Sequence, residues 1–303
     1  THGTGVQTCA LPIYPDSPRQ RFLAHLFQLF GSQGLLRAAM HYRWSYYQAQ
    51  DAFLDHAFGV SGAEDDPSRG AMRKMHSYLP GLGVRPDTIP LIEQGYIDLL
   101  AALEAHLSVH PYLLGGRPSI GDYGLFGPLF AHLGRDPVPA DIMKRRAPSV
   151  FRWIERLHAP DLDIPDMPDA DGWLAGDAVP DTLEALVAEM GAEMGAELGA
   201  KLAALEDHYQ RLAPADGDPV SAKPHQRTIG QTISRYRGIP DDVGVQPYLL
   251  YMVQRTEAAL GALSAEDRRW ADDLLARHGL SAIGAPRQAL VDRRNHIEVW
   301  ARP

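Results

Sequence analysis

The chain has 303 residues, of which 45% are hydrophobic and 22% charged, a balance typical of an ordinary globular protein. Lysine and arginine number 29 against 38 aspartates and glutamates, so the formal net charge is −9. Surfaces that bind nucleic acids or anionic membranes are usually basic, and the charge therefore argues against both partners. No apolar run reaches the roughly 18 residues of a transmembrane helix. The single cysteine, Cys9, excludes a disulfide within this sequence and favours a cytoplasmic location.

Residues 1–13, "THGTGVQTCALPI", differ from the rest of the chain. They show neither helical nor strand periodicity and lack the charged start of a secretory signal. The segment resembles a translated sequencing adapter, of the kind found at truncated ends of metagenomic reading frames. We therefore expect a non-native segment and a truncated protein; a disordered native terminus is the alternative.

Beyond this segment the apolar residues recur at helical spacing. Ser17 is the expected N-cap of a first helix, with Pro18 at its first position. A second helical stretch covers residues 34–59, and the polar residues 61–70 predict a break after it. A further helix begins near Pro90 and ends before the "HPYLLGGRP" turn. The pattern up to this point predicts helices only.

The next helix begins with "SIGDYGLFG", in which Ser119 and Asp122 have the spacing of a capping box. The apolar residues that follow leave no polar face, which predicts a helix buried on all sides. Each interior glycine costs a helix about 0.5–1 kcal/mol relative to alanine. Because Gly121, Gly124 and Gly127 recur every three residues, we expect a flat ridge against which neighbouring helices pack closely.

Residues 159–180 form an acidic, proline-rich linker. The seven aspartates of residues 159–181 lack the spacing of a calcium loop. The following region, 181–303, is expected to be a mostly helical extension that starts with one long helix. In that helix the repeat "EMGAEMGAELGAKL" predicts close packing along its glycines and an ion pair between Glu197 and Lys201. Residues 228–244 fit either a short hairpin or an irregular loop, Ser264 begins a second capping box, and residues 295–303 fit a strand.

The segments "YLLGGRPSIGDYGLFGPLF" and "RRAPSVFRWIERL" resemble the C-terminal helical domain of glutathione transferases, over about residues 14–158. In that family a Ser/Thr-x-x-Asp capping box opens the central buried helix, so the resemblance makes Ser119 and Asp122 structural residues. A later helix of the family has a Pro-x-Val-x-x-Trp-x-x-Arg pattern, matched here by Pro148, Val150, Trp153 and Arg156. The expected fold class is therefore all-α: a glutathione-transferase C-terminal-like helical bundle with an additional, mostly helical C-terminal extension.

The resemblance also implies how the function is divided between domains. In glutathione transferases a thioredoxin-like N-terminal domain binds glutathione, the co-substrate, and supplies the residue that activates its thiol. Because no pattern of that domain precedes Tyr14, we expect a truncated transferase-like protein that is inactive as given. No catalytic residue and no cofactor are expected in this chain.

The helical half of the family supplies the pocket for the electrophile. The cluster "AMHYRWSYY" lies where that pocket is expected, and its candidate residues are Met40, His41, Tyr42, Arg43 and Trp44. The aromatic and thioether side chains are suited to form apolar walls, and the basic ones are suited to steer an anionic small molecule. The alternative is that these side chains belong to the core, as aromatic residues at helical spacing usually do.

Three interpretations of the function of the chain remain open. The chain is either an enzyme fragment, a non-catalytic scaffold or dimerisation module of the same family, or an unrelated helical protein that binds small molecules. A homodimer is compatible with each of them. His106 and His110 have the spacing of a two-histidine metal site but no third ligand, so no metal is expected.

Overall fold

The computed structural model describes residues 13–61, 63, 65–159, 167, 172–223 and 226–302. Residues 1–12 of the segment expected to be non-native, with Cys9, and half of the acidic linker lie outside these residues. Within the described part of the chain, no helix is both long and apolar enough to cross a membrane.

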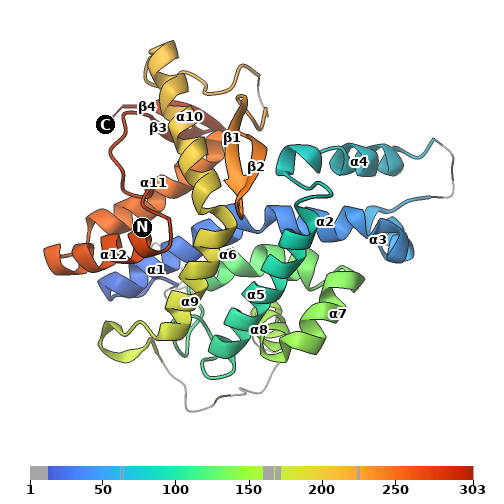
Figure 1. Cartoon of the computed structure of the whole chain (residues 1–303), viewed down its shortest axis with the longest axis horizontal. Helices are drawn as coiled ribbons and strands as arrows, with labels where there is room; N and C mark the ends of the chain where they lie inside the picture. The colour runs from blue at the N-terminus through green and yellow to red at the C-terminus, as the bar shows by residue number, and fades with distance from the viewer. Residues whose placement is uncertain are drawn as a thin grey trace, which may run out of the picture.

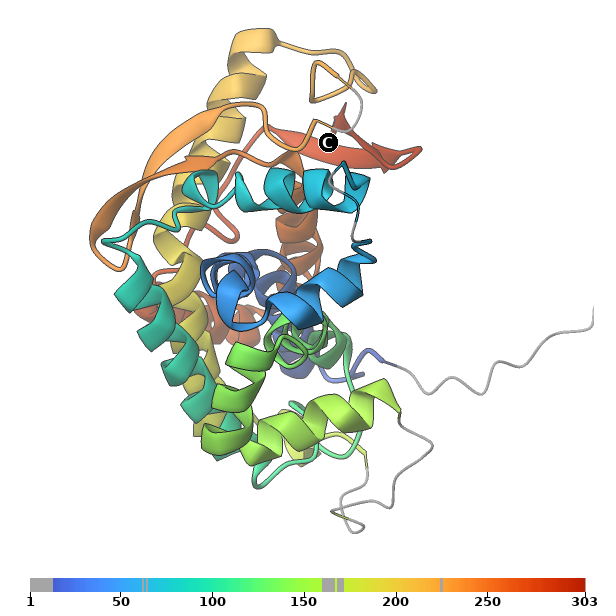
Figure 2. The ribbon, with the colours of Figure 1, turned by 90° about the vertical axis from the view of Figure 1, so that its right-hand side faces the viewer.

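Helices dominate the structure (Figures 1 and 2). The α-helices are α1 (Pro18–Leu29), α2 (Leu36–Ser45), α3 (Asp51–Phe58), α4 (Pro67–His76), α5 (Ile89–Leu107), α6 (Ile120–Pro128), α7 (Pro137–Arg146), α8 (Pro148–His158), α9 (Asp181–Met190), α10 (Ala196–Leu212), α11 (Pro247–Gly261) and α12 (Ala265–Arg277). Three π-helical segments, η1 (Phe30–Gly34), η4 (Leu129–Leu133) and η6 (Gly191–Gly195), and three 3₁₀ turns, η2 (Tyr47–Ala49), η3 (Pro80–Leu82) and η5 (Ala175–Asp177), complete the helical part.

Two antiparallel hairpins correct the all-α expectation to a mostly helical fold. Strands β1 (Gln231–Tyr236) and β2 (Ile239–Gly244) form the first, and β3 (Leu290–Arg294) and β4 (Ile297–Ala301) form the second. Both are closed by two residues with positive φ, Arg237 and Gly238 in the first and Asn295 and His296 in the second. Two-residue turns of this kind match the right-handed twist of the strands that they join. Residues 228–244 therefore contain a hairpin, one of the two structures that their sequence allowed.

The helical domain and the extension share one core. A continuous cluster of buried side chains runs from Phe22 in α1 to Trp300 in β4. Helix α1 packs against α6 on one side and α11 on another, and α9 packs along α5. A second, smaller cluster surrounds Trp44 and includes Met40, Leu54 and Met72. The extension is thus part of the same hydrophobic unit as residues 14–158.

The capping box expected at the start of α6 is present. The Asp122 carboxylate accepts hydrogen bonds from the Ser119 amide (2.8 Å) and the Ser119 hydroxyl (2.7 Å), while Asp122 N donates to Ser119 Oγ at 3.4 Å. Asp122 also accepts from Leu113 N (2.9 Å) and from the Trp153 indole (3.1 Å). This one carboxylate therefore joins the preceding turn, α6 and α8.

The glycine ridge is shorter than its spacing predicts. A Cβ on Gly124 would lie 2.5 Å from Gln28 Cα, and a Cβ on Gly121 would lie 3.1 Å from Phe27 Cβ. At Gly127 a Cβ would meet nothing within 4 Å, and Tyr123 is 39% exposed. The expectation that this helix is buried on all sides is wrong, because α1 covers only the face that carries Gly121 and Gly124.

The start of α1 is also capped differently from the expectation that the Ser17 side chain is its N-cap. Its hydroxyl donates to Gln20 Oε1 (3.1 Å) and makes no capping bond. The free amides of Arg19 and Gln20 donate instead to the two carboxylate oxygens of Asp177, at 2.9 and 3.0 Å. The first amides of a helix need an acceptor, and here a carboxylate from a distant part of the chain supplies it.

Candidate functional site

Two of the five predicted pocket residues, His41 and Tyr42, lie in the core, each 1% exposed. His41 Nδ1 is 2.9 Å from Ser45 Oγ, and Nε2 is 3.1 Å from Glu93 Oε1. Burial lowers the pKa of His41, so the ring is held in its neutral form at neutral pH. The ring of Tyr42 stacks on Tyr46. Neither side chain lines the cleft described below.

Arg43 is held by a buried partner. Its Nε and Nη2 each lie 2.7 Å from a different oxygen of Asp136, and Nη2 also donates to the Ala131 carbonyl at 3.1 Å. Asp136 is fully buried. This two-pronged pair compensates the charge of Arg43 and ties α2 to the start of α7. Arg43 is therefore a packing residue in this structure.

Trp44 faces a cleft, whereas Met40 packs in the small cluster around it. Trp44 is 4% exposed, and its ring lies 5.6 Å from that of Phe58. Its indole Nε1–H is buried and has no hydrogen-bond partner among the described residues. A buried donor of this kind costs free energy unless a ligand or a water accepts its hydrogen bond.

The cleft has a volume of about 570 Å³ and lies between the end of α2 and α4. It is lined by Trp44, Ser45, Tyr47, Gln48, Arg69, Met72, Arg73 and His76. Two aromatic rings and a thioether form apolar walls, and two arginines add positive charge beside His76. A cleft of this size accommodates a small organic molecule.

The basic side of the cleft comes from α4, which begins inside the predicted polar break. Asp66 caps this helix: its carboxylate accepts from Ser68 N (2.8 Å) and from the Ser61 hydroxyl (2.7 Å). These hydrogen bonds lower the pKa of Asp66 to about 2. The Asp-Pro pair at the helix start was the sequence signal that would have revealed α4.

The positive charge of the cleft is only partly compensated. Arg69 lies 3.6 Å from Asp55, and both side chains are partly exposed. For Arg73 and His76 no ion pair is found with any residue that the structure describes. The cleft therefore combines apolar walls and a basic side, and one of its walls is Trp44, whose buried indole donor has no partner among the described residues. Those properties suit an aromatic molecule that carries a negative charge.

Within the described ranges, no three His, Cys, Asp or Glu side chains are grouped to hold a metal ion. His106 is fully buried; its Nδ1 is 2.7 Å from Thr182 Oγ1, and its Nε2 is 3.0 Å from the Leu113 carbonyl. Burial lowers the pKa of His106 to about 4. Both ring nitrogens are thus used in packing the 107–113 turn against α9.

Residues 86–156 match the family described as "Glutathione S-transferase, C-terminal domain". The matched segment runs from just before α5 into α8 and includes the Ser119–Asp122 capping box. No curated protein and no solved structure matches the chain significantly.

Proposed function

With residues 86–156 forming a glutathione S-transferase C-terminal domain, we propose that the chain is a glutathione S-transferase-like protein whose α2–α4 cleft binds the electrophilic co-substrate. The observation that carries this proposal is that a basic cleft is lined by Trp44, whose buried indole N–H has no partner among the described residues. The co-substrate class is a small aromatic electrophile that bears a carboxylate or a similar anion.

The lining residues suggest how such a molecule would be held. The ring would pack between Trp44 and Met72, where aromatic and thioether contacts are favourable. Its anionic group would pair with Arg73 and His76. The Trp44 N–H would donate to a polar substituent, which would remove the cost of leaving that donor unpaired.

Glutathione is the second substrate in this proposal, and its thiol would be activated by groups outside the described residues. The strands of the described part form two antiparallel hairpins, with no parallel strand-helix-strand unit of the thioredoxin type. The chain would therefore contribute the co-substrate side of the reaction. We expect these residues alone to bind the electrophile without conjugating it.

A non-catalytic dimerisation module is the second candidate. Leu36 and Tyr123 are 42% and 39% exposed, and both line one hollow of about 440 Å³ together with Ile120 and Met252. Exposed apolar surfaces of this kind often mark protein contacts. Sedimentation that shows only monomer at high protein concentration would exclude this candidate.

Calorimetric titration tests the cleft. We expect 4-chloro-3-nitrobenzoate to bind, and Arg73→Ala to weaken its binding about tenfold, because a charge-assisted hydrogen bond is lost. The same substitution should change the affinity for the neutral 1-chloro-2-nitrobenzene little, since this compound has no carboxylate. Lys74→Ala is the matched control, because Lys74 is the next residue of α4 and does not line the cleft. Equal effects of the two substitutions would refute the assignment.

A further inference from the structure

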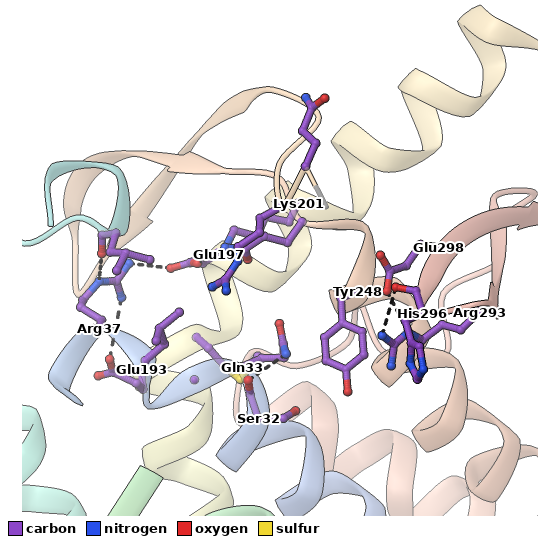
Figure 3. A pocket seen from close by; sticks show the side chains of 17 residues that line it. Ser32, Gln33, Arg37, Glu193, Glu197, Lys201, Tyr248, Arg293, His296 and Glu298 are labelled. Atoms are coloured by element: carbon purple, nitrogen blue, oxygen red, sulfur yellow. Dashed lines mark hydrogen bonds and ion pairs between the residues drawn. The ribbon is translucent and has the colours of Figure 1, made fainter. Parts of the chain in front are cut away.

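A second cleft lies where the helical domain meets the extension (Figure 3). Its volume is about 560 Å³. In Figure 3, Arg37 and Glu193 lie at one end, Arg293, His296 and Glu298 at the other, and Tyr248 stands between them. The extension supplies more than half of the lining, so this cleft exists only because the extension packs on the helical domain.

Two π-helical segments meet at this cleft. Segment η1 contributes Ser32 and Gln33, and η6 contributes Glu193 and Met194. They pack closely, since a Cβ on Gly34 would lie 3.1 Å from Met194 Sδ. A π-turn inserts an extra residue into a helix and is frequently found at functional sites.

The floor of the cleft is a buried network of charges. Arg37 is 6% exposed; its Nη2 lies 2.6 Å from Glu197, and its guanidinium lies 4.0 Å from the ring centre of Tyr236. Lys201 forms the predicted ion pair with Glu197, and its Nζ donates to Gln246 Oε1 at 3.2 Å. These partners compensate most of the buried charge.

Glu193 is the one carboxylate of the floor with an incomplete set of partners. Its Oε2 accepts from the Tyr236 hydroxyl (2.8 Å). Its Oε1 has no hydrogen bond to any residue that the structure describes, and among these residues Arg37 Nη1 lies 3.8 Å from it. Arg237 Nε, from the β1–β2 hairpin, lies 3.9 Å from Glu193 Oε2. Glu189 in α9 and Glu197 in α10 are the neighbouring carboxylates on either side of η6. Burial raises the pKa of Glu193 to about 7.

The rim of the cleft is basic. Arg227 is exposed and forms no ion pair with the described residues. Arg293 pairs with Glu298 at 3.0 Å, and its guanidinium lies 5.0 Å from the ring centre of the half-buried Tyr248. Four cationic side chains and three carboxylates line the cleft in all. The excess is one positive charge, and it becomes two when Glu193 is protonated.

We propose that this cleft binds a small aromatic phosphate monoester, with the phosphate between Arg227 and Lys201 and the ring against Tyr248, and that Glu193 takes up a proton on binding. A phosphate monoester carries close to two negative charges at neutral pH, which the cleft matches when Glu193 is neutral. Tyr248 supplies the flat apolar surface that the ring requires. This site is separate from the α2–α4 cleft and does not depend on it.

The test is calorimetry with phenyl phosphate, with inorganic phosphate as the probe that lacks the ring. We expect phenyl phosphate to bind more tightly, and Arg227→Ala to weaken it about tenfold. Arg211→Ala is the matched control, because that side chain is 68% exposed on α10 and outside the cleft. Arg73→Ala, which acts on the other cleft, should also leave this binding unchanged. Binding no tighter than that of inorganic phosphate, or unaffected by Arg227→Ala, would overturn the proposal.

The number of protons taken up on binding is measured by repeating the titration at pH 7.5 in two buffers with different heats of ionisation. The wild-type protein should take up a fraction of a proton, because Glu193 is mostly ionised before binding and neutral after it. Glu193→Gln should abolish this uptake and retain the binding. His296→Asn is the control for the histidine that lines the cleft, and it should leave the uptake in place. Uptake that persists in Glu193→Gln would refute the role of Glu193.

Discussion

Replacement of Asp122 by alanine should lower the free energy of unfolding by about 4 kcal/mol, since a buried donor left without its acceptor costs about 1–3 kcal/mol. The carboxylate accepts from Leu113 N, Ser119 N, Ser119 Oγ and Trp153 Nε1. Leu113, Ser119 and Trp153 are all buried, so the variant would remove the acceptor from donors that lie away from solvent. This cost exceeds that of an ordinary N-cap, which is about 0.5–2 kcal/mol and is what we expect for Ser119→Ala.

Urea denaturation measures this difference, and the chain contains its own control. Ser264 and Asp267 repeat the same spacing at the start of α12, where the Ser264 hydroxyl accepts from Asp267 N at 3.1 Å. Ser264 is exposed and Asp267 is partly exposed, so the donors of this site can bond to water. Asp267 also accepts from Arg19 Nε at 2.6 Å, in an ion pair at the surface that contributes little. Asp267→Ala should therefore cost only about 1 kcal/mol. Similar losses in Asp122→Ala and Asp267→Ala would show that the buried hub at Asp122 adds nothing to the cap.

The second large effect is expected for Gly31→Ala, which should destabilise the protein by about 3 kcal/mol or more through overpacking. A Cβ on Gly31 would overlap with the carbonyl of Gly124 and lie 2.5 Å from Leu125 N. These are backbone atoms of α6, so relief requires the two helices to separate. The helix contact lies in the core that surrounds Phe22 and Leu26, and separation would loosen the packing there.

The control for this prediction is Gly127→Ala, which should raise stability by about 0.5–1 kcal/mol because alanine favours the helix and the space beside Gly127 is open. Gly124→Ala should behave like Gly31→Ala, since its Cβ would lie 2.5 Å from Gln28 Cα. Thermal melting distinguishes these cases. A Gly31→Ala variant that melts at or above the wild-type temperature would contradict the close approach of η1 and α6.

Features that depend on neighbouring residues in the sequence could be predicted. The Ser119–Asp122 box and the Glu197–Lys201 pair are local, and both are present. The predicted close packing along the glycines of the long helix is also confirmed, since a Cβ on Gly195 would lie 2.7 Å from the Gly279 carbonyl oxygen. Such patterns show that a face is buried but do not identify its partner.

Features set by the tertiary arrangement could not be predicted. Asp177 caps α1 from 158 residues away in the chain, so Ser17 was the only local candidate. Gly127 continues the three-residue spacing of Gly121 and Gly124, and where α1 crosses α6 decides that it is open while they are packed. In the aromatic cluster, Trp44 lines a cleft and Tyr42 is in the core because α4 packs beside one of them only.

The cleft that contains Glu193 could be predicted only in part from the sequence. The glutamates of the long helix have the regular spacing of a solvated row, yet Glu193 is buried, because the β1–β2 hairpin and α2 cover it. A regular row of carboxylates in a helix rich in small residues, together with Arg37 in an apolar helix, was the available signal.

The central claim, that Trp44 contacts the co-substrate, is tested most directly by nuclear magnetic resonance of the indole N–H groups. The chain has five tryptophans, and Trp44→Phe identifies the signal of Trp44. On addition of 4-chloro-3-nitrobenzoate, we predict that the Trp44 N–H signal shifts, because its free donor gains an acceptor. The Trp153 signal, whose N–H is bonded to Asp122, should stay in place. An unchanged Trp44 signal at saturating ligand would contradict the proposed site.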